Sequence, residues 1–172
     1  MLLNSLKQNF SCSLFISSSR LLICETMRST MKRRNYNYGD KVEVCSKEEG
    51  FVGSYFKATI VSCLFNGQYL VRYKNLMQDD KSGLLLETVY LYEIRPLPSR
   101  VRSPKEFQLN QKVDAFDNDG WWLGQIASEK IITEEGHYYK VHFDTTYETI
   151  CYPSDRIRVH HDWFDGEWII EA

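Results

Sequence analysis

The sequence predicts an all-β chain made of two similar small barrels. Three observations carry this prediction. The motifs of residues 39–75 return in the same order in residues 110–145. Hydrophobic residues recur with a period of two in both copies, as in half-buried strands, and neither copy sustains the spacing of an amphipathic helix. Two copies alone favour sibling modules over a solenoid, which needs more repeats.

The repeat can be followed motif by motif, although the residues have diverged. The matching segments are 41–44 with 112–115, 55–60 with 121–126, 69–73 with 139–143, and 94–95 with 157–158. Because the matches keep their order, the two modules are expected to share one strand order.

The pattern of the first module predicts five short strands, at residues 41–44, 55–60, 69–73, 85–89 and 92–95. In the first of them Val42 and Val44 share one face, while Lys41 and Glu43 take the other. The Asn-Gly pair at residues 66–67 suits a tight type I′ turn between the second and third strands.

The second module repeats this scheme with strands at residues 112–115, 121–126, 139–143, 147–152 and 156–159. An aromatic tail, residues 160–168, is expected to pack back on the barrel. The prolines at 96, 98 and 104 favour extended backbone and mark the connection between the modules. The predicted division is a tail (1–35), a first barrel (36–97), a linker (98–106) and a second barrel with its aromatic tail (107–172).

Composition narrows the classes of partner. With 43% hydrophobic and 14% aromatic residues, 172 residues can bury two small cores. Residues 35–172 hold 15 basic and 22 acidic residues, which favours basic polypeptide partners over a phosphate backbone. The five scattered cysteines contain no C-x-x-C pair and predict reduced thiols in an intracellular protein. No apolar run reaches the ~18 residues that a membrane span needs.

Residues 1–34 are rich in serine, with six basic residues and one acidic residue. Three interpretations stay open: an organelle transit peptide, an upstream extension of a chain whose translation begins at Met27 or Met31, and a disordered tail in which residues 32–34 help nuclear import. The expected location is the nucleus, with an organelle as the alternative.

Short strands with one long curled pair and an early aromatic-lined loop describe an SH3-like barrel. The ordered pattern GDKVEV, EGFVGSYFKATI, QYLVRY and LYEIRP resembles the plant Agenet domain of the Tudor-like "royal family" group. The second copy, which ends in IRVHHDWFDGEW, resembles the partner domain of a tandem Agenet pair. This resemblance covers residues 38–168 and implies a chromatin reader that binds methylated lysine of a histone tail.

The resemblance also implies an aromatic cage at one end of a barrel. In the second barrel, the cage positions correspond to Phe116, Trp122, Phe143 and Tyr147, with Tyr147 one place later than the family pattern. In the first barrel, the candidates are Phe51, Tyr55, Phe56 and Tyr73. The acidic residues expected to contact the peptide's own Lys and Arg are Glu48, Glu49, Asp79 and Asp80.

A simpler interpretation stays open beside the cage. Phe56, Tyr73, Trp122 and Phe143 share the parity of core positions, and aromatic residues in a small barrel are most often core. Tyr55 and Trp121 have the opposite parity, so they are expected on the outer face or in the contact between the modules.

Other chemistry finds little support in the sequence. The His160-His161-Asp162 run with Cys151 lacks metal-ligand spacing, and no nucleophile with a paired base is recognisable. We therefore expect no catalysis, cofactor or metal.

The sequence is also compatible with two other kinds of partner. A basic stripe could bind RNA or DNA with tyrosine stacking; its members would be Arg72, Lys74, Arg95, Arg100, Arg102 and Lys105. A scaffold could instead bind another protein by strand addition at a barrel edge.

Overall fold

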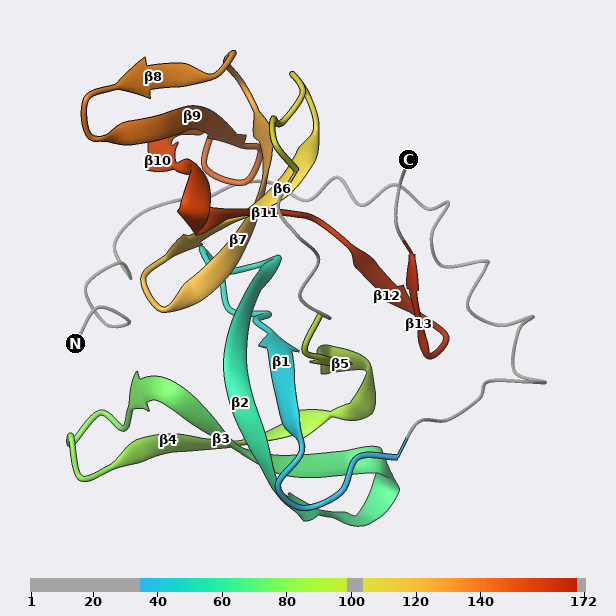
Figure 1. Ribbon diagram of the computed structural model, residues 1–172. Coiled ribbons are helices and arrows are strands. Elements are labelled where there is room, and N and C mark those ends of the chain that lie inside the picture. Colours follow the sequence, from blue (N-terminus) through green and yellow to red (C-terminus); the bar gives the residue numbers. More distant parts are fainter. Residues whose placement is uncertain (1–34, 99–103, 170–172) are drawn as a thin grey trace, which may run out of the picture.

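The computed structural model describes residues 35–98 and 104–169. Two antiparallel barrels lie one above the other in Figure 1, with a small hairpin to the side. Residues 1–34 of the expected tail and residues 99–103 of the expected linker lie outside the described residues. In the described ranges no helix is long and apolar enough to cross a membrane.

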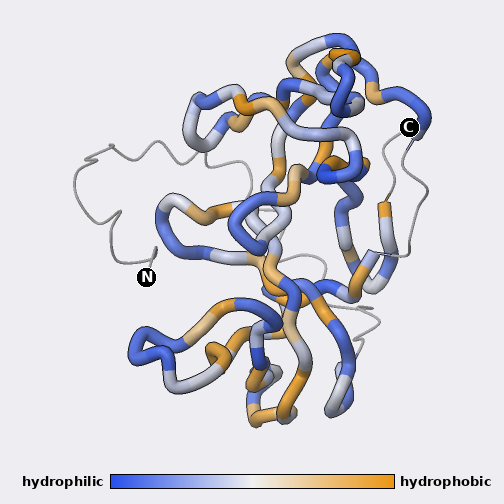
Figure 2. The backbone as a smooth tube through the Cα atoms, turned by 60° about the vertical axis from the view of Figure 1, so that its left-hand side comes forward, coloured by the Kyte–Doolittle hydropathy of each residue, from blue (hydrophilic) through white to orange (hydrophobic). Residues whose placement is uncertain are grey.

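The first barrel contains five strands in the order β5-β1-β2-β3-β4. They are β1 (Lys41–Cys45), β2 (Ser54–Cys63), β3 (Gln68–Met77), β4 (Leu84–Tyr90) and β5 (Ile94–Pro96), with single 3-10 turns at Phe65–Gly67 and Leu91–Glu93. Buried residues alternate with more exposed ones along β2 and the first part of β3, and Figure 2 shows hydrophobic and hydrophilic segments following one another along the chain.

The second barrel repeats this order as β11-β6-β7-β9-β10. Its strands are β6 (Lys112–Asp117), β7 (Gly120–Ile126), β9 (Gly136–Phe143), β10 (Glu148–Pro153) and β11 (Ile157–Val159), with the short β8 (Ile131–Thr133) paired to β9. A 3-10 turn at Ser154–Arg156 precedes β11. The repeated strand order confirms the predicted pair of SH3-like barrels.

Each barrel encloses a core of its own. Val42, Ile60 and Val71 are fully buried in the first, and Val113, Ile126 and Val141 occupy the second in the same way. Trp122 packs against both clusters. The two cores therefore meet at a single tryptophan.

The Asn66-Gly67 turn forms as its residue types predict. Asn66 has φ 62 and ψ 28, and Gly67 has φ 74, so both central residues are left-handed. The Gln68 N–H donates to the Phe65 carbonyl and closes the turn. This type I′ geometry matches the twist of the flanking strands.

The two barrels are joined by direct strand pairing. β2 and β7 run antiparallel with Ser54 opposite Trp122, Tyr55 opposite Trp121 and Phe56 opposite Gly120. Tyr55 and Trp121 are equivalent positions of the sequence repeat, so this register relates the barrels by an approximate two-fold axis. The chain is built like a symmetric dimer whose halves are covalently linked.

The aromatic tail forms a third unit, the hairpin of β12 (Asp162–Phe164) and β13 (Glu167–Ile169). Trp163 and Trp168 lie opposite one another, with ring centroids 5.1 Å apart. The Trp168 ring lies 5.4 Å from the Arg95 guanidinium, and Arg95 also donates to the His161 carbonyl at 3.2 Å. The expected packing therefore occurs, and it reaches the first barrel.

Candidate functional site

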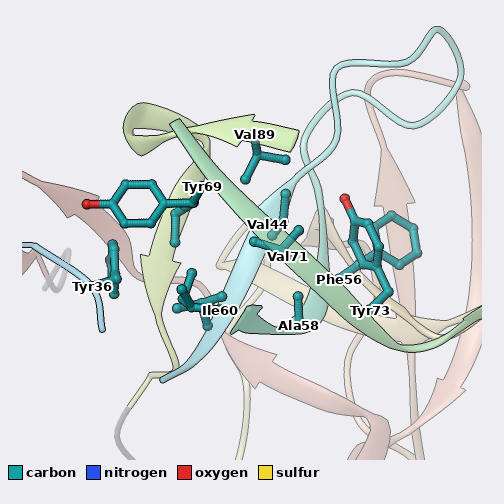
Figure 3. Packing of buried hydrophobic residues seen from close by; sticks show 11 residues of the cluster. Tyr36, Val44, Phe56, Ala58, Ile60, Tyr69, Val71, Tyr73 and Val89 are labelled. Atoms are coloured by element: carbon teal, nitrogen blue, oxygen red, sulfur yellow. The ribbon is translucent and has the colours of Figure 1, made fainter. Parts of the chain in front are cut away.

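Four aromatic side chains meet where β2 and β7 join the barrels. Phe51 comes from the loop between β1 and β2, Phe56 from β2, Tyr73 from β3 and Trp122 from β7. The Trp122 ring centroid lies 5.5 Å from that of Phe51 and 6.5 Å from that of Phe56, and Phe56 lies 6.4 Å from Tyr73. Figure 3 shows Phe56 and Tyr73 together at one end of the first core. We call these four residues the junction cluster.

Local geometry holds Trp122 in the junction cluster. Its indole N–H donates to the Asp117 carbonyl at 2.8 Å, which fixes the ring orientation. Gly120 lies opposite Phe56, and a Cβ there would come within 2.8 Å of the Phe56 ring. A glycine is needed at this position because it lets β7 approach β2 closely enough for the rings to meet.

Carboxylates accompany the junction cluster. The Tyr73 hydroxyl donates to the Glu87 carboxylate. Burial, together with this bond and the charges of Glu87, Glu93 and Glu48, raises the pKa of Tyr73, so its hydroxyl stays protonated at neutral pH. Glu48 and Glu49 are exposed in the loop that carries Phe51. Aromatic faces beside carboxylates suit a cation rather than an anion.

A small cavity of about 40 Å³ lies beside the junction cluster, between the barrels. Its lining is Phe56, Lys57, Lys74, Asn75, Leu76, Phe116 and Asp119. Asn75 donates to the Asp119 carboxylate at 2.7 Å and so bridges the two modules. A space of this size can hold a water molecule, and of the junction cluster only Phe56 lines it. The rings of the junction cluster lie 5.5–6.5 Å apart between centroids, so a methylated ammonium group enters between them only if they part.

The rings predicted as a cage in the second barrel have separate neighbours. Phe116 packs on Trp121 at 5.1 Å, and Trp122 belongs to the junction cluster. Phe143 is buried against Tyr152 at 6.1 Å. Tyr147 is 85% exposed in the turn before β10, where its φ is 59. Of this set, Trp122 thus contacts predicted rings of the first barrel, and Phe116 shares the small cavity with Phe56.

The remaining predicted residues lie around the first barrel. Phe51, Phe56 and Tyr73 are in the junction cluster, but the Tyr55 ring faces the Arg95 guanidinium at 3.2 Å. Asp79 and Asp80 are exposed in the loop between β3 and β4. Hydrogen bonds from Ser82 to Asp80 lower the pKa of that carboxyl group.

The contact between the barrels contains a buried ionic quartet that sequence reasoning missed. Its members are Glu43, Arg95, Asp114 and Arg158, and the two acids are 0% and 1% exposed. Arg95 lies 2.8 Å from Glu43 and 3.5 Å from Asp114. Arg158 lies 2.9 Å from each acid. Each arginine therefore binds the acid of both modules.

The quartet follows the approximate two-fold axis. Tyr55 stacks on Arg95 at 3.2 Å, and its counterpart Trp121 stacks on Arg158 at 4.0 Å. Burial raises the pKa of Tyr55 to about 12. Both rings occupy the module contact, one of the two placements that their parity predicts. Planar guanidinium groups suit this combination of stacking and paired carboxylates.

His160 extends the quartet toward the hairpin. Its Nδ1 lies 2.6 Å from an Asp114 oxygen, and its Nε2 lies 3.3 Å from Asp162. Burial opposes protonation of His160, but the hydrogen bond and charge of Asp114 outweigh it and raise its pKa. Burial alone would raise the pKa of Asp114. The hydrogen bond from His160 and the charges of Arg158, His160 and Arg95 outweigh burial, so the pKa of Asp114 is lowered.

One feature of the sequence repeat could have indicated this quartet. Each module has an acid on its first strand and an arginine on its last, at equivalent repeat positions: Glu43 with Arg95, and Asp114 with Arg158. The expected basic stripe is corrected at Arg95, which is 3% exposed and bound to Glu43. Arg100 and Arg102 lie outside the described residues. Within residues 35–98 and 104–169, no group of three or more His, Cys, Asp or Glu side chains could hold a metal ion.

Comparison with known proteins identifies the family to which this pair of barrels belongs. The Agenet domain family model matches residues 39–99. The crystal structure of AGD34 of Arabidopsis thaliana AGDP1 is similar, with a TM-score of 0.72 and 33% identity, over 79% of this chain and 90% of that chain. The chain belongs to the Agenet family. The structure of the ADCP1 tandem Agenet domain 3-4 has a TM-score of 0.68 and 29% identity, over 80% and 89% of the two chains.

Curated relatives from Arabidopsis thaliana extend this result. Protein AGENET DOMAIN (AGD)-CONTAINING P1 is 34% identical over 142 residues, or 83% of this chain, and DUF724 domain-containing protein 3 is 35% identical over 133 residues, or 74%. This chain spans only 27% and 19% of those two relatives. The chain is a tandem Agenet unit. Agenet domains are chromatin and protein-interaction modules and are generally non-enzymatic.

Proposed function

We propose that this tandem Agenet unit reads a methylated lysine of a histone tail in the nucleus, through the junction cluster. One observation carries the proposal: Trp122 of the second barrel meets Phe51 and Phe56 of the first, and the neighbouring Tyr73 binds the Glu87 carboxylate. The site is composite, because neither barrel supplies all four rings.

The chemistry of the junction cluster fits a methylated ammonium group. Methylation leaves the charge but weakens hydration, so aromatic faces gain a cation–π attraction of ~0.5–2 kcal/mol. Phe56 and Tyr73 are buried, whereas Phe51 and Trp122 are half-buried and reachable from solvent. The ligand enters between Phe51 and Trp122, and Phe51 moves with its loop.

The surrounding charge supports a basic peptide. Glu48 and Glu49 in the loop of Phe51 face solvent and are placed to bind the lysine and arginine side chains that flank the methylated residue. Residues 35–172 carry an excess of acid, which speeds the encounter with a basic tail.

Calorimetric titration with histone tail peptides tests this proposal. We expect di- or trimethyl-lysine peptides to bind more tightly than the unmodified peptide. Phe51→Ala and Trp122→Leu should each weaken that binding about tenfold, the loss of one good cation–π contact. Tyr147→Ala is the matched control, because Tyr147 is an 85% exposed ring outside the junction cluster.

Two results contradict the proposal. One is equal binding of methylated and unmodified peptides. The other is full retention of methyl-lysine binding in both Phe51→Ala and Trp122→Leu, with circular dichroism showing that the variants are folded.

A further inference from the structure

A second and larger hollow lies at the other end of the first barrel. It is a groove of about 1260 Å³ between that barrel and the β12–β13 hairpin. Figure 3 shows Tyr36 and Tyr69, which line it, at the opposite end of the core from Phe56 and Tyr73. The groove is therefore separate from the junction cluster.

Aromatic side chains form both walls of the groove. The barrel contributes Tyr69, Tyr90 and Tyr92, and the hairpin contributes Trp163 and Phe164. Tyr92 is 71% exposed, Phe164 59% and Tyr90 43%. So many exposed rings on one surface mark an interaction site.

The tyrosine pair at the rim is already arranged to hold a cation. Tyr90 and Tyr92 stack with centroids 5.3 Å apart and an interplanar angle of 10°. Lys47 Nζ lies 4.1 Å from the Tyr92 ring centroid and 3.0 Å from Glu93. The Tyr90 backbone N–H donates to Glu93, which fixes the short turn that carries both rings. One lysine of this chain thus already uses the Tyr92 ring as a cation platform.

The charged side chains in and beside the groove indicate the charge of a partner that would bind there. Over residues 35–98 and 104–169, its lining contains one charged side chain, Asp165. The hairpin residues 162–169 also carry Asp162 and Glu167 and contain no lysine or arginine. Asp162 is engaged by His160, whereas Asp165 and Glu167 face solvent. At the rim, the charge of Lys47 is offset by Glu93 at 3.0 Å, so the excess charge beside the groove is that of Asp165 and Glu167. An aromatic floor with this acidic excess suits a basic, partly apolar segment and disfavours a phosphate backbone.

We propose that this groove is a second docking site, which binds an extended basic protein segment with bulky apolar side chains. Small-molecule pockets usually measure ~300–1,000 Å³, so the groove is sized for a peptide. Apolar side chains of the partner cover Tyr69 and Phe164. Its lysine or arginine side chains lie against Asp165 and take the place of Lys47 on the Tyr92 ring, and the Asn66 amide can bind its backbone. The proposal does not depend on methyl-lysine recognition.

A pair of synthetic peptides tests the groove in the full chain. The probes are fluorescein-labelled dodecapeptides of repeated Arg-Gly-Leu and of repeated Glu-Gly-Leu, and the readout is fluorescence anisotropy. We expect the arginine peptide to bind, with an affinity that falls as salt rises, and the glutamate peptide to bind at least about tenfold more weakly.

Variants locate the binding. Tyr92→Ala and Phe164→Ala should each weaken the arginine peptide about tenfold, and Asp165→Asn should reduce the salt dependence. Tyr147→Ala is the matched control, because Tyr147 is 85% exposed on the second barrel. Trp122→Leu should leave this binding unchanged while it weakens methyl-lysine peptides, which separates the two sites.

Four outcomes overturn the proposal. The first is equal binding of both peptides, and the second is equal loss in Tyr147→Ala. The third is a chain dimer in sedimentation that Tyr92→Ala dissociates, which would make a second copy the occupant. The fourth is failure of the arginine peptide to bind while trypsin cleaves at Arg20 and Arg28 faster in Tyr92→Ala than in the unaltered chain. That result would assign the groove to the chain's own residues 1–34.

Discussion

Asp114 shows how one residue can organise a junction. Its carboxylate accepts from Arg158 at 2.9 Å, lies 3.5 Å from Arg95 and meets His160 at 2.6 Å. Such a buried charge is tolerated because its partners are present, and it becomes costly when one is removed. The alternation along β1 predicts that its counterpart Glu43 lies on the face away from the core. The second barrel covers this outer face, so Glu43 is buried.

His160 makes the stability of the junction depend on pH. Its pKa is raised in the folded state, so its stabilising effect is complete below about pH 6.5 and is lost as pH rises through the raised value. The pKa of Asp114 is lowered, so its effect is lost only in acid. We expect the free energy of unfolding to fall as pH rises above about 6.5 and through the raised pKa of His160, by no more than about 1.4 kcal/mol per pH unit.

Urea denaturation of the unaltered chain and of His160→Gln measures this effect. The variant should show a flatter profile over the alkaline range. Burial lowers the pKa of His161, which therefore acts in the opposite direction below about pH 6.5. A profile in His160→Gln that is as steep as that of the unaltered chain would remove His160 as the cause.

At the scale of the element, β7 depends on its two glycines. A Cβ on Gly124 would lie 2.6 Å from a Val141 methyl carbon and 2.7 Å from the His142 carbonyl oxygen of β9. The backbone oxygen cannot rotate away, so a methyl group there pushes β7 from β9. The equivalent position in the first barrel is Ala58, which is 3% exposed. The first barrel thus accommodates a methyl group at the position where the second has none.

Gly124→Ala should destabilise the protein by about 1–3 kcal/mol, as overpacked cores do. Gly83→Ala is the matched control, since no atom lies within 4 Å of its added Cβ and its φ is not left-handed. Thermal unfolding followed by circular dichroism compares the two. Similar melting temperatures for both variants would mean that β9 yields more easily than the contact distances imply.

At the scale of the whole molecule, the two barrels share stabilising contacts. The β2–β7 pairing continues the hydrogen bonding from one barrel into the other, and the ionic quartet buries charges from both. Separating the barrels would expose Trp122 and leave the quartet incomplete. Neither barrel can open without cost to its partner.

Calorimetry should therefore record a single unfolding transition for the unaltered chain, with equal calorimetric and van't Hoff enthalpies. Glu43→Gln removes one acid from the buried Arg95 and the half-buried Arg158, and it should cost about 3–5 kcal/mol. Glu129→Gln, at an exposed position, should change stability by less than about 0.5 kcal/mol. Two resolved transitions in the unaltered chain would show that the barrels unfold independently.

The sequence by itself determined the all-β class, the duplicated strand order and the Asn66-Gly67 turn. These features follow from local chemistry, namely a hydrophobic period of two and residues that accept left-handed backbone. The Agenet resemblance added the aromatic candidates Phe51, Phe56, Tyr73 and Trp122. Alternation along a strand says which side chains share a face, but it does not say what covers that face.

Only the tertiary structure decided how the barrels meet. The β2–β7 pairing carries Trp122 to the first barrel, away from the second-barrel positions with which the sequence groups it. The same pairing buries Glu43 and Arg95. The reason is that both outcomes depend on contacts between residues far apart in the chain, and no local pattern encodes such contacts.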